Sequence, residues 1–146
     1  MNAAQSQAYG IALLRIALGS LYIVHSAYLK VFVFTVPGTV AFFESLGLPA
    51  LFAYGTLAAE ILGGLALVLG FKTRYAAAFL IPVALGATWA HSGFGWLFSN
   101  QGGGWEYPLF LAVTTTVVVL LGDGAFSVSA KTDSQKVALN SASSVV

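Results

Sequence analysis

Six side chains of this sequence belong to types that bind small molecules or move protons, and each stands near the end of an apolar stretch. They are His25, Lys30, His91, Trp105, Glu106 and Tyr107. A histidine donates a hydrogen bond to a carbonyl and a carboxylate takes up and releases protons, so the set suits a quinone head or another small redox substrate. This chemistry requires that separate segments bring the side chains together.

Each of the six also has a purely structural interpretation. A histidine near a helix end commonly caps the helix or lies at the membrane interface. Tryptophan and tyrosine are typical of the headgroup level of a bilayer. Convergence of the six side chains is therefore the prediction that separates a binding site from a set of interfacial residues.

Metal and haem sites have less support than a quinone site. His25, His91 and Glu106 supply enough ligands for zinc or non-haem iron, but no diagnostic spacing supports such a site. The two histidines are expected at different depths, which disfavours joint ligation of a haem. The sequence has 0 cysteines, which excludes thiolate metal sites, disulfides and c-type haem attachment. We expect no metal site, and a quinone is the candidate cofactor.

The composition places these residues in a membrane protein. Of the 146 residues, 58% are hydrophobic and 8% are charged, whereas a soluble domain has about 25% charged residues. The lipid bilayer is therefore an expected partner. The formal net charge of +1 offers no basic surface for nucleic acid.

Four apolar stretches approach the length of about 20 residues that a membrane-spanning helix needs. They lie at about 9–29, 51–69, 75–90 and 107–121. A short helix in the first outer loop is expected to lie in the interface plane. The fold class predicted is all-α integral membrane, a four-transmembrane-helix bundle over residues 1–124. A disordered cytoplasmic tail is expected at 125–146.

The basic residues outside the spans predict the orientation. Four of them are expected on one side of the membrane, namely Lys72, Arg74, Lys131 and Lys136. The fifth, Lys30, is expected on the other side. By the positive-inside rule both termini are cytoplasmic. The two long loops, at 30–50 and 91–106, then lie on the non-cytoplasmic side.

Two charged residues are expected within the bilayer, where an unpaired charge costs several kcal/mol on most scales. They are Arg15 in the first span and Glu60 in the second. We predict an ion pair between them, extended by Tyr22 or by a threonine of the fourth span. The alternative is that Arg15 reaches the cytoplasmic interface while Glu60 is protonated and hydrogen-bonded.

Several motifs in order along the chain resemble the DoxX family of small bacterial four-helix membrane proteins. The resemblance covers about residues 13–121, and Ser26 departs from it, because a glycine commonly follows the first-span histidine in the family. The motifs are Leu14-Arg15-Ile16-Ala17-Leu18-Gly19 with His25 and Lys30, Ala41-Phe42-Phe43-Glu44-Ser45-Leu46-Gly47-Leu48-Pro49, Ala59-Glu60-Ile61-Leu62-Gly63-Gly64, Gly70 with the Arg74 turn, and Gly102-Gly103-Gly104-Trp105-Glu106-Tyr107-Pro108.

The resemblance implies a multi-pass protein of the bacterial cytoplasmic (inner) membrane. Some relatives are described as membrane subunits of a thiosulfate:quinone oxidoreductase, and others as partners of oxidant-defence or peptide-modification systems. The first hypothesis is a membrane subunit of an oxidoreductase assembly that binds a quinone or small redox substrate at the non-cytoplasmic mouth. A non-enzymatic scaffold or assembly factor and a small transporter are the alternatives, and each implies a protein partner or a homo-oligomer. The family's recurrent polar positions fall on Arg15, His25, Lys30, Glu60, His91, Trp105 and Glu106.

Overall fold

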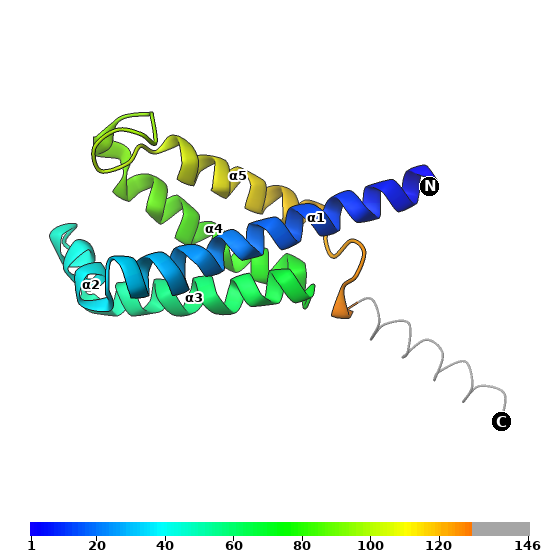
Figure 1. Ribbon diagram of the computed structural model, residues 1–146, viewed down its shortest axis with the longest axis horizontal. Coiled ribbons are helices and arrows are strands. Elements are labelled where there is room, and N and C mark those ends of the chain that lie inside the picture. The colour runs from blue at the N-terminus through cyan, green and yellow to red at the C-terminus, as the bar shows by residue number, and fades with distance from the viewer. Residues whose placement is uncertain (130–146) are drawn as a thin grey trace, which may run out of the picture.

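A computed structural model describes residues 1–129, and these residues form helices joined by turns and loops, without a strand (Figure 1). The all-α prediction is confirmed for this part of the chain. The elements in order are α1 (Ala3–Ile23), the π-helix η1 (Val24–Val33), α2 (Val36–Ser45), α3 (Ala50–Leu69), α4 (Thr73–Ala90), the 3-10 turn η2 (Ser92–Phe94) and α5 (Glu106–Leu121).

Within residues 1–129, three helical segments are long and apolar enough to cross a membrane. They are Ala3–Val33, Ala50–Leu69 and Thr73–Phe94, whereas Glu106–Leu121 is apolar but shorter. At about 1.5 Å per residue, the 16 residues of α5 extend about 24 Å. A helical membrane protein is thus confirmed, while the fourth span stays a prediction. A short helix does form in the first loop, as α2, and its position in the interface plane stays a prediction.

The first helix is longer than the sequence indicated. α1 and η1 together form 31 continuous helical residues, where a span at about 9–29 was expected. Asn2 starts the helix because its side chain accepts from the Gln5 amide while the Gln5 side chain accepts from the Asn2 amide. This reciprocal capping box stabilises polar first turns that a hydropathy criterion does not include.

The helices pack as two antiparallel pairs, α1 with α3 and α4 with α5, and α3 joins the pairs by packing on α4 (Figure 1). One end of the molecule, here called the loop end, holds η1, α2 and the loop at 91–106. The other, the terminal end, holds the N-terminus, the α3–α4 turn and residues 122–129. Gly19 and Gly64 bring the first pair into backbone contact, since a Cβ atom on Gly19 would lie 2.6 Å from the Gly64 carbonyl oxygen.

The chain after α5 folds against the terminal end. The Ala125 amide donates to the Ala8 carbonyl oxygen at 2.9 Å, and the Ser129 amide donates to the Gly70 carbonyl oxygen at 3.2 Å. The disordered tail predicted from residue 125 is therefore wrong for 125–129, because backbone groups of α1 and of the α3–α4 turn bind this segment. The rest of the predicted tail, 130–146, lies outside the described residues.

Candidate functional site

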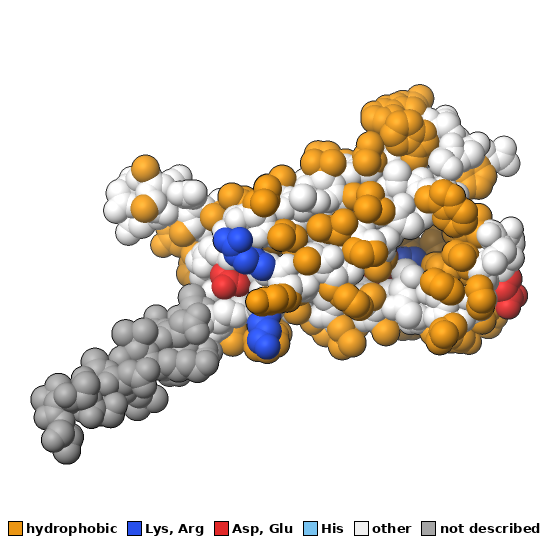
Figure 2. All heavy atoms as spheres, turned by 180° about the vertical axis from the view of Figure 1, so that it is seen from behind, with side chains coloured by type: hydrophobic (Ala, Val, Ile, Leu, Met, Phe, Trp, Pro, Cys, Tyr) orange, Lys and Arg blue, Asp and Glu red, His pale blue; other side chains and the backbone are white. Residues whose placement is uncertain are grey.

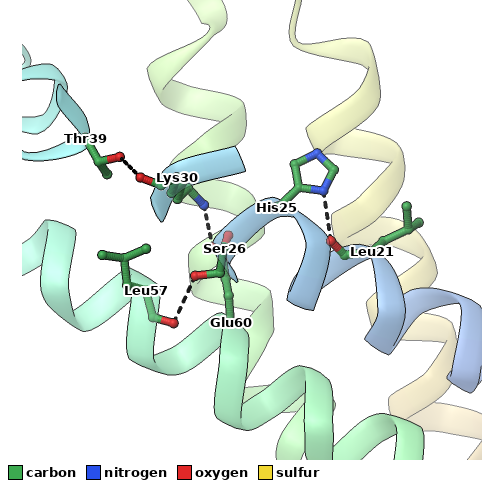
Figure 3. A network of polar contacts seen from close by, with 7 residues as sticks. All are labelled: Leu21, His25, Ser26, Lys30, Thr39, Leu57 and Glu60. Carbon is green, nitrogen blue, oxygen red and sulfur yellow. Dashed lines mark hydrogen bonds and ion pairs between the residues drawn. The ribbon is translucent and has the colours of Figure 1, made fainter. Parts of the chain in front are cut away.

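An ion pair between Lys30 and Glu60 lies inside the loop-end half of the first helix pair (Figure 3). Lys30 comes from η1 and its Nζ atom donates to the Glu60 carboxylate of α3. The Lys30 side chain is 21% exposed and that of Glu60 is 7% exposed. The pair is therefore mostly withdrawn from solvent, with its ammonium side more open than its carboxylate side.

The predicted Arg15–Glu60 ion pair is not formed, and the direction of helical side chains gives the reason. Side chains tilt toward the N-terminus of their own helix. In the antiparallel α1–α3 pair, Lys30 therefore tilts toward the terminal end and Glu60 toward the loop end, so that they meet. Ser26 lies opposite Leu57, and this register leaves Arg15 about 12 Å short of the Glu60 level.

Arg15 instead binds the end of α3. Its guanidinium donates to the carbonyl oxygens of Leu67, of Val68 at 2.8 Å and of Ala125 at 3.1 Å, and the side chain is fully buried. The last carbonyls of a helix lack partners within it and carry partial negative charge. A buried cation at this position thus has a structural role, the capping of α3, and the Asp123 carboxylate also acts on it electrostatically.

Two hydroxyl groups hold η1 beside the ion pair (Figure 3). The fully buried Ser26 donates to the Leu57 carbonyl oxygen at 3.0 Å, and Thr39 of α2 donates to the Lys30 carbonyl oxygen at 2.9 Å. π-Helical turns are rare and occur frequently at functional sites. Sequence reasoning did not assign these two residues to the site. The signal for Ser26 was its departure from the family's glycine, and Thr39 offered none.

The Tyr22 and Thr115 hydroxyls extend the polar interior toward α5. They lie 2.8 Å apart and both side chains are fully buried. Thr115 donates to the Leu111 carbonyl oxygen at 2.6 Å, so the Tyr22 hydroxyl is the donor to Thr115. The Glu60 carboxylate also acts electrostatically on Tyr22. We call Tyr22, Lys30, Glu60 and Thr115 the inner polar cluster.

A second contact at the loop end joins the two helix pairs. The rings of His25 in η1 and Tyr107 in α5 stack with centroids 5.6 Å apart and an interplanar angle of 20°. The Nδ1 atom of His25 lies 2.9 Å from the Leu21 carbonyl oxygen, and because a carbonyl only accepts, this nitrogen carries the hydrogen. In Figure 3, His25 points away from Lys30 and Glu60, on the other side of η1.

The other predicted site residues organise the loop at 91–106. The Glu106 carboxylate accepts from the Phe98 amide at 2.9 Å, and the rings of Trp105 and Trp96 pack edge to face at 4.5 Å. His91 donates through Nδ1 to the Ala87 carbonyl oxygen at 2.8 Å and packs its ring on Phe42 and Phe94.

The structure therefore divides the six predicted residues into three groups. His25 meets Tyr107, Lys30 meets Glu60, and the remaining three, His91, Trp105 and Glu106, shape the loop. Within residues 1–129, no three His, Asp or Glu side chains are arranged to hold a metal ion. Figure 2 shows a hollow near the loop end with basic side-chain atoms in it. Lys30 is the one lysine or arginine of this end in the described part of the chain.

These features define a class of protein, a helical membrane protein with an ion pair and hydroxyl groups in its interior. The chain belongs to the DoxX family, whose model matches residues 10–93, more than half of the sequence. Family membership and the three long apolar helices make it a multi-pass membrane protein. The matched range includes Arg15, His25, Lys30, Glu60 and His91 and ends before Trp105.

Among curated proteins, the chain is similar to the one named "Putative oxidoreductase CatD" of Bacillus subtilis (strain 168). The two are 36% identical over 78 residues, which are 53% of this chain and 56% of that protein. The similarity thus spans about half the length of each. No solved structure matches the chain.

Proposed function

We propose that this chain is a membrane subunit of an oxidoreductase assembly and that it binds a quinone head, or a small redox substrate of similar shape, at the loop end. The observation that carries the proposal is the stacked pair of His25 and Tyr107 between the two helix pairs. Flat aromatic groups pack favourably against such rings. The oxidoreductase name of the similar Bacillus subtilis protein favours the same class of function.

The ring nitrogens of His25 determine which step the pair performs. Because Nδ1 donates to the Leu21 carbonyl oxygen, Nε2 of the neutral ring is an acceptor. Nε2 takes a proton from a quinol hydroxyl, and the imidazolium that results donates to a quinone carbonyl. The Tyr107 hydroxyl is a second donor. A partner protein of the assembly accepts or supplies the electrons.

Quinone binding by the purified protein tests this proposal. We expect His25→Gln and Tyr107→Phe each to weaken binding of a short-tailed quinone at least about tenfold, a change of about 1.4 kcal/mol. Tyr54→Phe is the matched control, because Tyr54 is 53% exposed on α3, and it is expected to bind as the unaltered chain does. Unchanged affinity in both folded loop-end variants would refute the site.

The membrane placement belongs to the same proposal. We place the chain in the bacterial inner membrane with α5 as its fourth span, α2 in the interface plane and both termini in the cytoplasm. Lys72 and Arg74 at the terminal end support this orientation by the positive-inside rule. Lys30 is a basic residue at the loop end and counts only weakly against this orientation, because Glu60 offsets its charge. A reporter that is active only in the cytoplasm should be active when it is fused after residue 129. A reporter that is active only outside the cytoplasm should be inactive at the same position.

A scaffold role is the second candidate, and the exposed aromatic surface of the loop at 91–106 favours it. Trp96 is 51% exposed and Phe98 is 69% exposed, although Glu106 and Trp105 hold the loop in place. A partner subunit or a second copy of the chain would cover these rings. Co-purification in mild detergent distinguishes the roles, since a scaffold keeps its partner in a His25→Gln variant and loses it in a Trp96→Ala variant.

A further inference from the structure

We infer that the ligand of the loop end is a quinone with a long hydrocarbon tail, that it enters sideways from the bilayer, and that its tail lies in a groove between α3 and α4. The inference rests on the proposed function for the quinone head and adds the place of the tail. It narrows the ligand from small redox substrates in general to a lipid. The evidence is the lining of the groove, its depth and the polar groups beside it.

The groove lies where α3 and α4 separate. The two helices touch at Gly63, because a Cβ atom on this glycine would lie 2.8 Å from the Cγ atom of the fully buried Leu80. From this contact they diverge toward the loop end (Figure 1). Pro82 lies inside α4 on the diverging side, and a proline within a helix removes one backbone hydrogen bond and bends the helix. The groove has a volume of about 360 Å³.

A hydrocarbon chain fits this groove because its lining is apolar apart from the Thr56 hydroxyl. On α3 the lining residues include Gly55 and Ala59, and a Cβ atom built on Gly55 meets no atom within 4 Å. Leu51 and Phe79, which line the groove from α3 and α4, are exposed. Both helices belong to segments that are long and apolar enough to cross a membrane, so lipid chains surround the groove.

The inner end of the groove reaches the polar interior of the bundle. Ala59 lines the groove, and the next residue, Glu60, binds Lys30. α3 begins at Ala50, so Glu60 lies about 15 Å from the loop-end start of the helix. A charged phospholipid head is costly at such a depth. A lipid that brings its head to this level therefore has an uncharged head, as a quinone does.

The bundle is open from the side near this level. Figure 2 shows a hollow on the side of the bundle near the loop end, with hydrophobic side chains around it and basic atoms inside. Lys30 is the basic residue of this end within residues 1–129, and its side chain is 21% exposed. An ammonium group has three N–H donors, and Glu60 accepts from one of them. The others are donors for the carbonyl of a quinone that enters from the side.

The groove and the proposed head site both lie where the first helix pair faces the second. The groove runs between α3 and α4, and the stacked rings of His25 and Tyr107 belong to η1 and α5. A tail in the groove thus leaves its head between the helix pairs. The ion pair of Lys30 and Glu60 has no net charge, which matches an uncharged head on this path.

Binding of two quinones that differ only in their tails tests the inference. A short-tailed quinone reports on the head site alone, and a quinone with the same head and a long prenyl tail reports on the head site and the groove. Gly55→Phe places a ring in the open space of the groove. We expect it to weaken binding of the long-tailed quinone at least about fivefold, as overpacking does. Binding of the short-tailed quinone should change less than about twofold.

Gly10→Phe is the matched control, because Gly10 lies in α1 and likewise has no atom within 4 Å of a Cβ atom built on it. It should bind both quinones as the unaltered chain does. If the unaltered chain binds neither quinone, the proposed function fails and the inference fails with it. If the chain binds both, and Gly55→Phe weakens neither or weakens both equally, the groove assignment alone is wrong.

A photoreactive tail locates the occupant of the groove directly. A long-tailed quinone with a diazirine in its tail should label peptides from residues 50–59 and 79–83, and excess unlabelled long-tailed quinone should suppress this labelling. Labelling by the quinone that is confined to other helices would overturn the inference. The same holds if a phospholipid with a diazirine in its acyl chain labels these peptides and excess quinone does not displace it, because a bulk lipid then fills the groove.

Discussion

Replacing Gly19 with alanine should separate α1 from α3 and thereby loosen both ends of the first helix pair. The added Cβ atom would lie 2.6 Å from the Gly64 carbonyl oxygen and 2.9 Å from the Leu67 Cβ atom. Ordinary contact begins at 3.4 Å, so the backbones must move apart by about 0.8 Å to relieve the overpacking. Neither near neighbour is the free end of a flexible side chain, so a rotamer change does not suffice.

The expected cost is about 2 kcal/mol, within the range for overpacked positions. Part of this cost arises outside the contact, because a displaced α1 also lengthens the bonds from Arg15 to the end of α3 and from Ser26 to Leu57. Small residues at membrane helix interfaces are favoured for this reason, since they let backbones approach closely.

Reversible unfolding in mixed micelles measures this change in free energy. Gly86→Ala is the matched control, because no atom lies within 4 Å of a Cβ atom built on Gly86 and both glycines lie inside helices. We expect that control to change stability by less than about 0.5 kcal/mol. If Gly19→Ala unfolds like the unaltered protein, or if Gly86→Ala costs as much, the close packing described for α1 and α3 is incorrect.

Three further outcomes follow from the interior contacts. Lys30→Met should destabilise by about 2 kcal/mol because it leaves Glu60 unpaired, and a second Glu60→Met change should restore most of the loss in a double-mutant cycle. Thr115→Val should cost more than Tyr22→Phe, by about 1 kcal/mol in the same unfolding assay, because only the first leaves a buried hydroxyl donor without its acceptor. Arg15→Lys should lower the thermal midpoint, since one ammonium replaces a guanidinium that reaches three carbonyls.

The length and hydropathy of the apolar stretches were enough to find the long α-helices, although they gave no sign of the π-helix η1. The boundaries of the predicted second and fourth spans agree with those of α3 and α5 to within about one residue. They agree because these helices end where the hydropathy of the sequence falls. The same criterion missed the polar start of α1, where Asn2 and Gln5 supply the stabilisation. It also missed the docked segment at 125–129, whose bonds are made by backbone atoms that carry no sequence signal.

The candidate site was predictable in its residue types and not in its pairings. The scarcity of charge showed that Arg15 and Glu60 needed partners, because unpaired charge in a bilayer is costly, whereas Lys30 was expected outside the bilayer at the end of the first span. The expected depths of these residues in the bilayer then favoured Arg15 as the partner of Glu60. Depth omits the direction of the side chains, which in antiparallel helices brings Lys30 toward Glu60 and takes Arg15 away from it.

The sequence by itself thus determined the class of protein, a helical membrane protein with few and consequential polar residues, because composition and period depend on local chemistry alone. Only the tertiary structure decided which polar residues meet. His25 and Tyr107 are 82 positions apart and stack because the tertiary arrangement brings η1 and the first turn of α5 within reach of each other. Such contacts depend on register, tilt and backbone approach at Gly19 and Gly64, and those quantities are set by packing of the whole bundle.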